Sequence, residues 1–276
     1  LVRQHDAPVY TITYYAHWLL MESIAAHGYR VSVSGSAADE LFSGYYDHHL
    51  AYLHAIRDDA ELFERSLRAW EREIRPFVRN PLLQDPLRLV RDPEAREHVF
   101  FRADDFTDRL TEPWSEPFTE RRFGFDLLRD RMLNELFHEA VPVILHEDDL
   151  NAMYFSIENR SPYLDRELFE FCYRVPTRHL VRDGRAKAVL RDAMRGIVPE
   201  RVLDSPRKVG FNAPIASFLD RRDPAVRAEL LRDSPIFDVV RRDRVAELLD
   251  VEELPNSESK FLFSFIGTKF FLEQSS

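Results

Sequence analysis

Residues 29–42 read YRVSVSGSAADELF and predict a strand, a loop of small residues and the start of a helix. Val31 and Val33 alternate with polar residues, as in a β-strand, and Gly35 follows where that strand would end. Ligands usually bind at the carboxyl ends of the strands in an α/β sheet. We therefore expect the loop over residues 34–40 to lie at a ligand site.

Helical patterns flank this strand on both sides. Apolar residues from Tyr14 to Ala25 recur at helical intervals, and Gly28 stands where a helix would end. Prolines between residues 76 and 93 should break one stretch into short pieces, which we expect on the surface. Further helices are expected over residues 125–145, 165–174, 187–195 and 257–271. The pattern predicts an α/β fold with a large helical portion.

Composition excludes several classes of protein. The chain of 276 residues is 45% hydrophobic and carries a net charge of −10, which argues against disorder and against nucleic acid as the main partner. No apolar run approaches the roughly 20 residues that span a bilayer, so no membrane partner is expected. Cys172 is the only cysteine; we expect it to be buried as a small apolar side chain, and the absence of disulfide chemistry indicates a cytoplasmic protein.

The loop after the strand has residue types that suit a nucleotide and a metal ion. Gly35 would let the backbone approach a phosphate, Ser34 offers a hydroxyl and an N–H, and Asp39 is a hard oxygen ligand for Mg²⁺. A plain structural alternative is a strand-to-helix turn in which Asp39 and Glu40 favour the helix start. Short glycine motifs leave both interpretations open.

Four motifs in order resemble the synthetase domain of glutamine-hydrolysing asparagine synthetases. The first resembles that family's SGEGADELFGGY signature and the second its SLExRxPFLD segment. The third and fourth resemble its KxxLR and KxGFxxP segments. In this chain the four are SGSAADELFSGY over residues 34–45, SIENRSPYLD over 156–165, KAVLR over 187–191 and RKVGFNAP over 207–214.

The resemblance implies a Rossmann-like ATP-pyrophosphatase fold in which ATP adenylates a carboxylate, pyrophosphate leaves and an amine forms the amide. Ser34 and Gly35 would hold the nucleotide near its α-phosphate, and Asp39 would bind Mg²⁺. Lys187 matches a catalytic lysine that meets pyrophosphate, and Lys208 is a second nucleotide-binding candidate. Only four lysines occur in the chain, among 38 Lys and Arg residues, so two in such motifs are notable.

A carboxylate that helps to deprotonate the amine is expected before the second motif. We favour Glu147, with Asp149 second. Ser36 completes the catalytic candidates because it occupies the position that carries Glu in asparagine synthetases and Tyr in β-lactam synthetases. Glu158 and Arg160 are expected to form a buried ion pair or to contact the substrate.

The resemblance also implies missing parts. The SGGxDS pyrophosphate loop and the N-terminal glutaminase cysteine of the family are absent, so we expect an upstream glutaminase and phosphate-loop portion on the same or a companion chain. The chain would be the C-terminal part of a synthetase domain. Its expected parts are a nucleotide-site edge over residues 1–50, a helical excursion over 51–124 and a helical remainder with catalytic motifs over 125–276.

Three functions fit these motifs. The leading one amidates aspartate or a related acid with glutamine-derived ammonia. The replacement at Ser36 keeps an intramolecular amide-forming synthetase open, and a non-catalytic scaffold is the third. A homodimer is also open. His48 and His49 follow the first motif, but successive helical residues point about 100° apart, so we expect surface or packing residues rather than a metal site.

Overall fold

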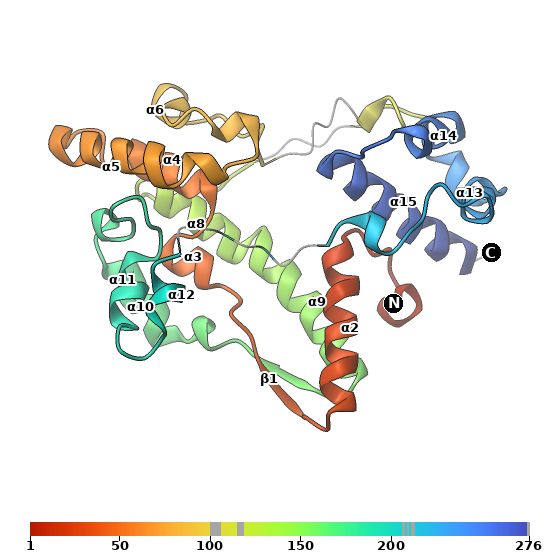
Figure 1. Ribbon diagram of the computed structural model, residues 1–276, viewed down its shortest axis with the longest axis horizontal. Helices are drawn as coiled ribbons and strands as arrows, with labels where there is room; N and C mark the ends of the chain where they lie inside the picture. Colours follow the sequence, from red (N-terminus) through yellow and green to blue (C-terminus); the bar gives the residue numbers. More distant parts are fainter. Residues whose placement is uncertain (100–105, 115–118, 206–207, 209, 211–212, 275–276) are drawn as a thin grey trace.

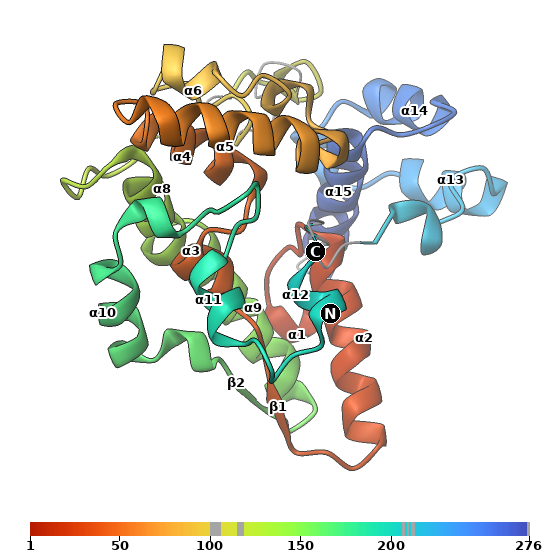
Figure 2. The same ribbon diagram turned by 60° about the vertical axis from the view of Figure 1, so that its left-hand side comes forward.

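The computed structural model describes residues 1–99, 106–114, 119–205, 208, 210 and 213–274 and is drawn in Figures 1 and 2. It is a helix-rich α/β structure with a small parallel sheet. Among the described residues the strands are β1 (Val31–Val33) and β2 (Glu158–Arg160). The helices before β2 are α1 (Val2–His5), α2 (Ile12–Ala26), α3 (Ala38–Phe42), α4 (Tyr46–Ala55), α5 (Ala60–Glu73), α6 (Arg88–Arg91), α8 (Leu127–Phe137) and α9 (Ala140–Tyr154).

The chain after β2 is also helical. Its α-helices are α10 (Arg166–Arg174), α11 (Ala188–Ala193), α12 (Glu200–Leu203), α13 (Pro224–Leu231), α14 (Arg242–Asp250) and α15 (Asn256–Gln274). Single 3₁₀ turns occur at Arg75–Phe77, Pro81–Leu83, Pro162–Leu164, Thr177–His179, Ile215–Ser217 and Pro235–Asp238. The helix expected from Tyr14 to Ala25 is confirmed as α2, and Gly28 follows it at φ +82°.

Parallel pairing of β1 and β2 decides where the first two motifs lie. Ser32 is opposite Asn159 in the register, and Ser32 Oγ donates a hydrogen bond of 2.8 Å to Asn159 Oδ1. Ser34 N–H then donates to Arg160 O at 2.8 Å, just past the end of β1. Because parallel strands end at the same edge of a sheet, the segments after both strands emerge side by side.

One hydrophobic cluster supports the elements that follow the first motif. It joins α4, α5, α6 and α8, with Leu50, Trp70 and Leu128 among its most buried side chains. A short helix, α3, packs against α8, α10 and α11 through Leu41 and Phe42, which are buried in a second cluster. The first motif is therefore held between two cores.

The C-terminal helices α13, α14 and α15 share a separate hydrophobic cluster. In Figures 1 and 2, α2 lies beside α9, and α15 packs near α13 and α14. The cluster around α15 includes Ile236, Leu262 and Phe265. The final helix expected over residues 257–271 is thus confirmed, and it docks closely enough that a Cβ on Gly267 would meet Val9 O at 2.2 Å.

Three expectations about local structure need correction. Residues 125–145 form two helices rather than one, α8 and α9, and Pro142 is accommodated in the first turn of α9, where its missing N–H costs no helical bond. The proline-rich stretch does break into short pieces, but Val78, Leu83 and Leu89 are buried in the first cluster, so it is not only a surface excursion. The expected boundary after residue 50 falls inside α4.

Within the described residues no helix is both long enough and apolar enough to cross a membrane.

The core of α8 gives a test of this packing. Leu128 is fully buried, whereas Leu20 on α2 is 43% exposed. We expect Leu128→Ala to lower the free energy of unfolding by about 3 kcal/mol, because it removes buried methyl groups and leaves a cavity. The same change at Leu20 should cost less than about 1 kcal/mol. Urea denaturation of both variants measures the difference, and equal losses would contradict the assignment of α8 to the core.

Candidate active site

The loop after β1 and the loop after β2 meet through serine hydroxyls. Ser34 Oγ lies 3.0 Å from Ser161 Oγ and donates to Ser36 Oγ at 3.2 Å. Ser36 Oγ in turn lies 3.5 Å from Asp148 Oδ2 on α9, at the outer limit of a hydrogen bond. Residues of the first two motifs therefore line one edge of the sheet.

Two strained residues fix the orientation of α3. Ala37 and Ser43, at either end of this helix, have φ values of +72° and +68°. Non-glycine residues adopt this left-handed region at a cost of about 1–3 kcal/mol, and such strain gathers at functional sites. The burial of Leu41 and Phe42 anchors the helix, so that Asp39 in its first turn faces the third and fourth motifs.

The centre of the site is the Asp39 carboxylate, which lies between two lysines. Lys187 Nζ lies 2.7 Å from Asp39 Oδ1, and Lys208 Nζ donates to Asp39 Oδ2 at 2.6 Å. Burial alone would raise the pKa of Asp39, but the two ammonium groups outweigh it and lower the pKa. The first, third and fourth motifs thus meet as one carboxylate and two cations.

Backbone geometry presents each lysine to Asp39. Lys187 has φ +60° and immediately precedes α11, which Arg191 ties to the preceding loop by donating to Ala186 O at 2.8 Å. The Lys208 ammonium also lies over the Tyr45 ring, 5.2 Å from its centroid. Lys187 is therefore not the plain helix-surface lysine that its motif alone would allow.

The structure describes part of the fourth motif. Arg207, Val209, Phe211 and Asn212 lie outside the described residues, whereas Lys208 and Gly210 lie within them.

Gly44 makes the close approach of Asp39 to Lys187 possible. A Cβ at this position would lie 1.6 Å from Asp39 Oδ1 and 2.8 Å from Lys187 Cε. Any larger residue would have to displace one of these groups. A glycine is therefore required at position 44 because Asp39 and Lys187 lie so close to it, and not because of its own φ angle.

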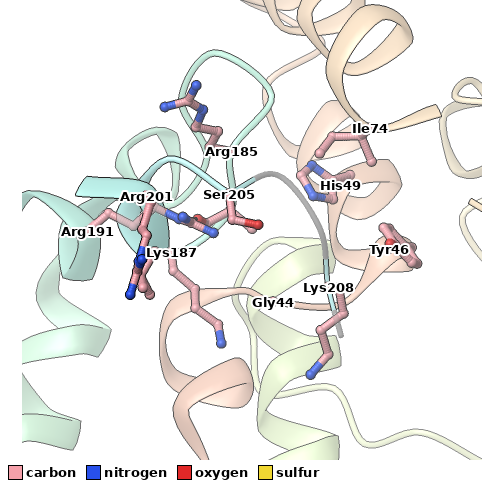
Figure 3. Close-up of a pocket in the computed structure, with 12 residues that line it drawn as sticks. Gly44, Tyr46, His49, Ile74, Arg185, Lys187, Arg191, Arg201, Ser205 and Lys208 are labelled. Atoms are coloured by element: carbon pink, nitrogen blue, oxygen red, sulfur yellow. Dashed lines mark hydrogen bonds between the residues drawn. The ribbon is translucent and has the colours of Figure 1, made fainter. Parts of the chain in front are cut away.

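A cationic cavity adjoins the two lysines. It has a volume of about 560 Å³, and its described lining carries the side chains of Arg185, Lys187, Arg191, Arg201 and Lys208 but no carboxylate. Figure 3 shows Lys187 and Lys208 on either side of Gly44, with their amino groups pointing to the same side of the loop. This arrangement favours a polyanionic ligand.

The acidic segment of α9 presents its carboxylates in three directions. Glu147 is buried, and its Oε2 lies 2.8 Å from His5 Nδ1. Asp148 faces Ser36 and also lies 3.5 Å from His17 Nδ1, whereas Asp149 is exposed. Burial raises the pKa of Asp148 and lowers that of His17. The three residues lie in the middle of α9 rather than at a helix start.

Asp148 is not among the candidate bases named from the sequence. The expected base was Glu147, with Asp149 second, and the structure brings neither into contact with the serine loop. Successive residues of a helix differ by about 100° in direction, so a miscount by one residue changes the face on which a side chain lies. Only the packing of α9 against α2 and the loop identifies Asp148.

One further expectation is corrected. Glu158 and Arg160 do pair at 2.9 Å, but their side chains are 63% and 60% exposed, because β2 lies at the surface. His48 and His49 are buried on α4 rather than at the surface, which supports their expected packing role. Cys172 is buried, as expected.

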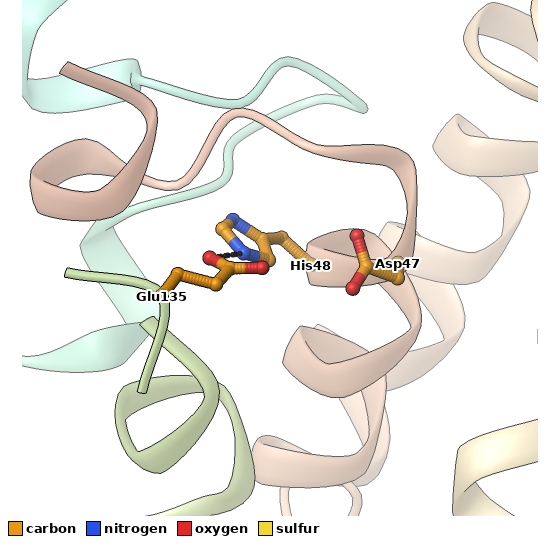
Figure 4. Close-up of side chains that lie close together, drawn as sticks. All are labelled: Asp47, His48 and Glu135. Atoms are coloured by element: carbon orange, nitrogen blue, oxygen red, sulfur yellow. Dashed lines mark hydrogen bonds and ion pairs between the residues drawn. The ribbon is translucent and has the colours of Figure 1, made fainter. Parts of the chain in front are cut away.

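Asp47, His48 and Glu135 lie close enough to suggest a metal site (Figure 4). His48 Nε2 is already bonded to Glu135 Oε2 at 2.7 Å. Arg131 supplies the positive charge, with its guanidinium 3.1 Å from Glu135 Oε1 and 3.7 Å from Asp47 Oδ2. The group is therefore explained as a buried ion-pair network without a metal ion.

The residues around Asp39 do fit a magnesium–phosphate ligand. Mg²⁺ is commonly held by one or two carboxylates together with substrate phosphates. Lysine is a compact cation suited to phosphate oxygens. One carboxylate with two ammonium groups can exchange partners, so that the lysines bind phosphate and Asp39 binds the metal ion.

Gly44 gives a test of this site. We expect Gly44→Ala to lower the free energy of unfolding by about 2 kcal/mol, because the new Cβ forces Asp39 or Lys187 out of place. Gly35→Ala is the matched control, since a Cβ at Gly35 meets nothing within 4 Å, and it should change stability by less than about 0.5 kcal/mol. Chemical denaturation compares the two. Equal effects would mean that the contact between Gly44 and Asp39 does not form.

Comparison with known proteins agrees with these motifs. The sequence profile of the asparagine synthase family matches residues 1–269. Glutamine-hydrolyzing asparagine synthetase 3 of Bacillus subtilis is 27% identical over 231 residues, covering 80% of this chain and 33% of that protein. Synthetase 1 of the same organism is 33% identical over 107 residues, covering 39% of this chain and 17% of the relative.

A putative glutamine-hydrolyzing asparagine synthetase of Mycobacterium bovis is 35% identical over 96 residues, covering 35% of this chain and 15% of that protein. The chain thus corresponds to a third or less of the length of these relatives. The match over residues 1–269 shows that this chain belongs to the asparagine synthase family.

Proposed function

We propose that this chain supplies part of the active site of an ATP-dependent ligase that activates a carboxylate, releases pyrophosphate and forms an amide. The observation that carries the proposal is the Asp39 carboxylate held between Lys187 and Lys208 beside a cationic cavity. A pyrophosphate leaving group develops negative charge, and ammonium groups held beside it stabilise that charge. The curated relatives are named as asparagine synthetases, which supports aspartate or a related acid as the substrate.

The residues have distinct roles in this proposal. Ser34 and Gly35 would bind the nucleotide near its α-phosphate, where the loop leaves the sheet. Lys187 and Lys208 would bind the pyrophosphate oxygens, and Asp39 would hold Mg²⁺. The metal ion, when bound, would neutralise phosphate charge and orient the leaving group. The lysines would thereby exchange the carboxylate for phosphate as ligand binds.

A base for the attacking amine is proposed at Asp148. It is the α9 carboxylate that faces Ser36, and its raised pKa increases its strength as a base. Ser36 would orient this carboxylate, while His17 contacts it from α2. Glu147, the first candidate from the sequence, contacts His5 instead and stays the alternative base.

An upstream portion with the glutaminase and the phosphate loop is proposed as the partner, on the same or a companion chain. Parallel sheets are almost always covered on both faces, yet Val31 and Val33 on β1 are 45% and 70% exposed. This exposure supports further chain packing on or beside β1. Glutamine-derived ammonia as the amine, a homodimer and a cytoplasmic location stay predictions that rest on the resemblance and the composition.

The proposal is tested with this chain joined to the upstream portion, supplied with Mg²⁺·ATP, aspartate and ammonia. We expect pyrophosphate release and amide formation in wild type. Asp148→Asn should slow amide formation about 100-fold, the contribution of a general base. It should also abolish the decline of the rate as pH falls through the pKa of Asp148, below which the carboxylate is protonated.

Asp149→Asn is the matched control and should stay within about twofold of wild type, because its side chain is exposed on the same helix. Glu147→Gln tests the alternative base. Failure of wild type to release pyrophosphate with any candidate acid would contradict the ligase. Equal activity of the variants at 148 and 149 would contradict only the assignment of the base.

A further inference from the structure

A chain of buried hydrogen bonds leads from α8 to the loop of the first motif. The Oε2 atom of Glu135 on α8 lies 2.7 Å from His48 Nε2 (Figure 4). The other ring nitrogen, His48 Nδ1, accepts a hydrogen bond of 3.1 Å from Gly44 N–H. All three residues are buried, so these bonds form away from water, where leaving a group unpaired is costly.

The geometry fixes the tautomer of the ring. A backbone N–H can only donate, so Nδ1 of His48 must carry a lone pair and the ring proton must lie on Nε2. Nε2–H then donates to Glu135. Arg131 holds the other oxygen of Glu135 at 3.1 Å. Arg131 thus holds Glu135 in place, and Glu135 stabilises the His48 tautomer that can accept a hydrogen bond from Gly44 N–H.

The loop at Gly44 needs such an anchor. Ser43 before it is buried at φ +68°, and its Oγ has no hydrogen-bond partner among the residues that the structure describes. A strained residue persists only when its surroundings hold it in place. The bond from Gly44 N–H to His48 is the contact that holds the next peptide of this loop.

The position of Gly44 affects the contact between Asp39 and Lys187. Asp39 Oδ1 and Lys187 Cε lie so close to Gly44 that a Cβ there would overlap the first and crowd the second. A shift of the Gly44 peptide would therefore open or close the space in which Asp39 meets Lys187. His48 touches neither of these charged groups, so it acts on them through Gly44.

We propose that His48, oriented by Glu135, is a positioning residue for the Asp39–Lys187–Lys208 site. It holds Gly44 in the place that brings Asp39 and Lys187 together. The role deepens the proposed function, on which it rests for the identity of the ligand. His48 and Glu135, which both lie outside the four motifs, would thus contribute to ligand binding.

Two isosteric variants separate this role from simple packing. His48→Asn keeps an oxygen near the place of Nδ1, which can accept from Gly44, but does not reach Glu135. His48→Gln reaches toward Glu135 but lacks an acceptor at the place of Nδ1. Selective ¹⁵N-glycine labelling gives only eight amide signals, because the chain has eight glycines, and hydrogen exchange of the Gly44 amide reports the bond directly.

We expect the Gly44 amide to exchange at least about tenfold faster in His48→Gln than in His48→Asn, because the Gln variant loses the hydrogen bond of this amide. The affinity for magnesium pyrophosphate, measured by titration calorimetry, should fall in the same order. If the Gly44 amide is equally protected in both variants, or if the Gln variant binds as tightly as the Asn variant, the positioning role is wrong.

Glu135→Leu provides a second route if either His48 variant fails to fold. It leaves His48 in place but removes the acceptor for Nε2–H, so the ring is free to take the other tautomer and Gly44 should exchange faster. Unchanged exchange in this variant would overturn the proposal. If wild type shows the protected Gly44 amide but binds no magnesium pyrophosphate, the failure lies with the proposed ligand and function instead.

Discussion

The pairing of one carboxylate with two ammonium groups is the constraint on which the site depends. Asp39 is largely buried, and a buried carboxylate stays ionised only if cations or hydrogen bonds replace water. Lys187 and Lys208 meet it from segments far along the chain, at 2.7 and 2.6 Å. The first, third and fourth motifs are therefore tied together by the contacts of this one carboxylate.

The parallel pair of strands provides the frame for this contact. Register between β1 and β2 brings Ser34 beside Ser161, and α3 then projects Asp39 from the edge of the sheet. Left-handed backbone at Ala37, Ser43 and Lys187 redirects the chain at each end of the site. The strain is maintained by the buried side chains of α3 and by the bond between Gly44 and His48. Packing energy thus holds the charged groups in position.

Much of this site could be predicted from the sequence, because motif residues of fixed type and order carry it. Asp39, Lys187 and Lys208 were expected at one site, and they meet there. The proposed base on α9 could not be predicted to the residue, since the phase of a helix depends on what packs against it; the contact with Ser36 is made by Asp148, whereas Glu147 contacts His5. The burial of His48 depends on Glu135, 87 residues away, a pairing that no local pattern reveals. The exposure of Glu158 and Arg160 likewise follows from where β2 lies.

The proposed function requires Lys187 and Lys208 to exchange Asp39 for phosphate when ligand binds. With only four lysines in the chain, selective labelling of lysine side chains allows each ammonium to be followed by NMR during titration with magnesium pyrophosphate. We expect the signals of Lys187 and Lys208 to shift together with one affinity, while those of Lys260 and Lys269 on α15 stay unchanged. Saturating ligand that leaves the first two signals in place, or that moves all four alike, would contradict it.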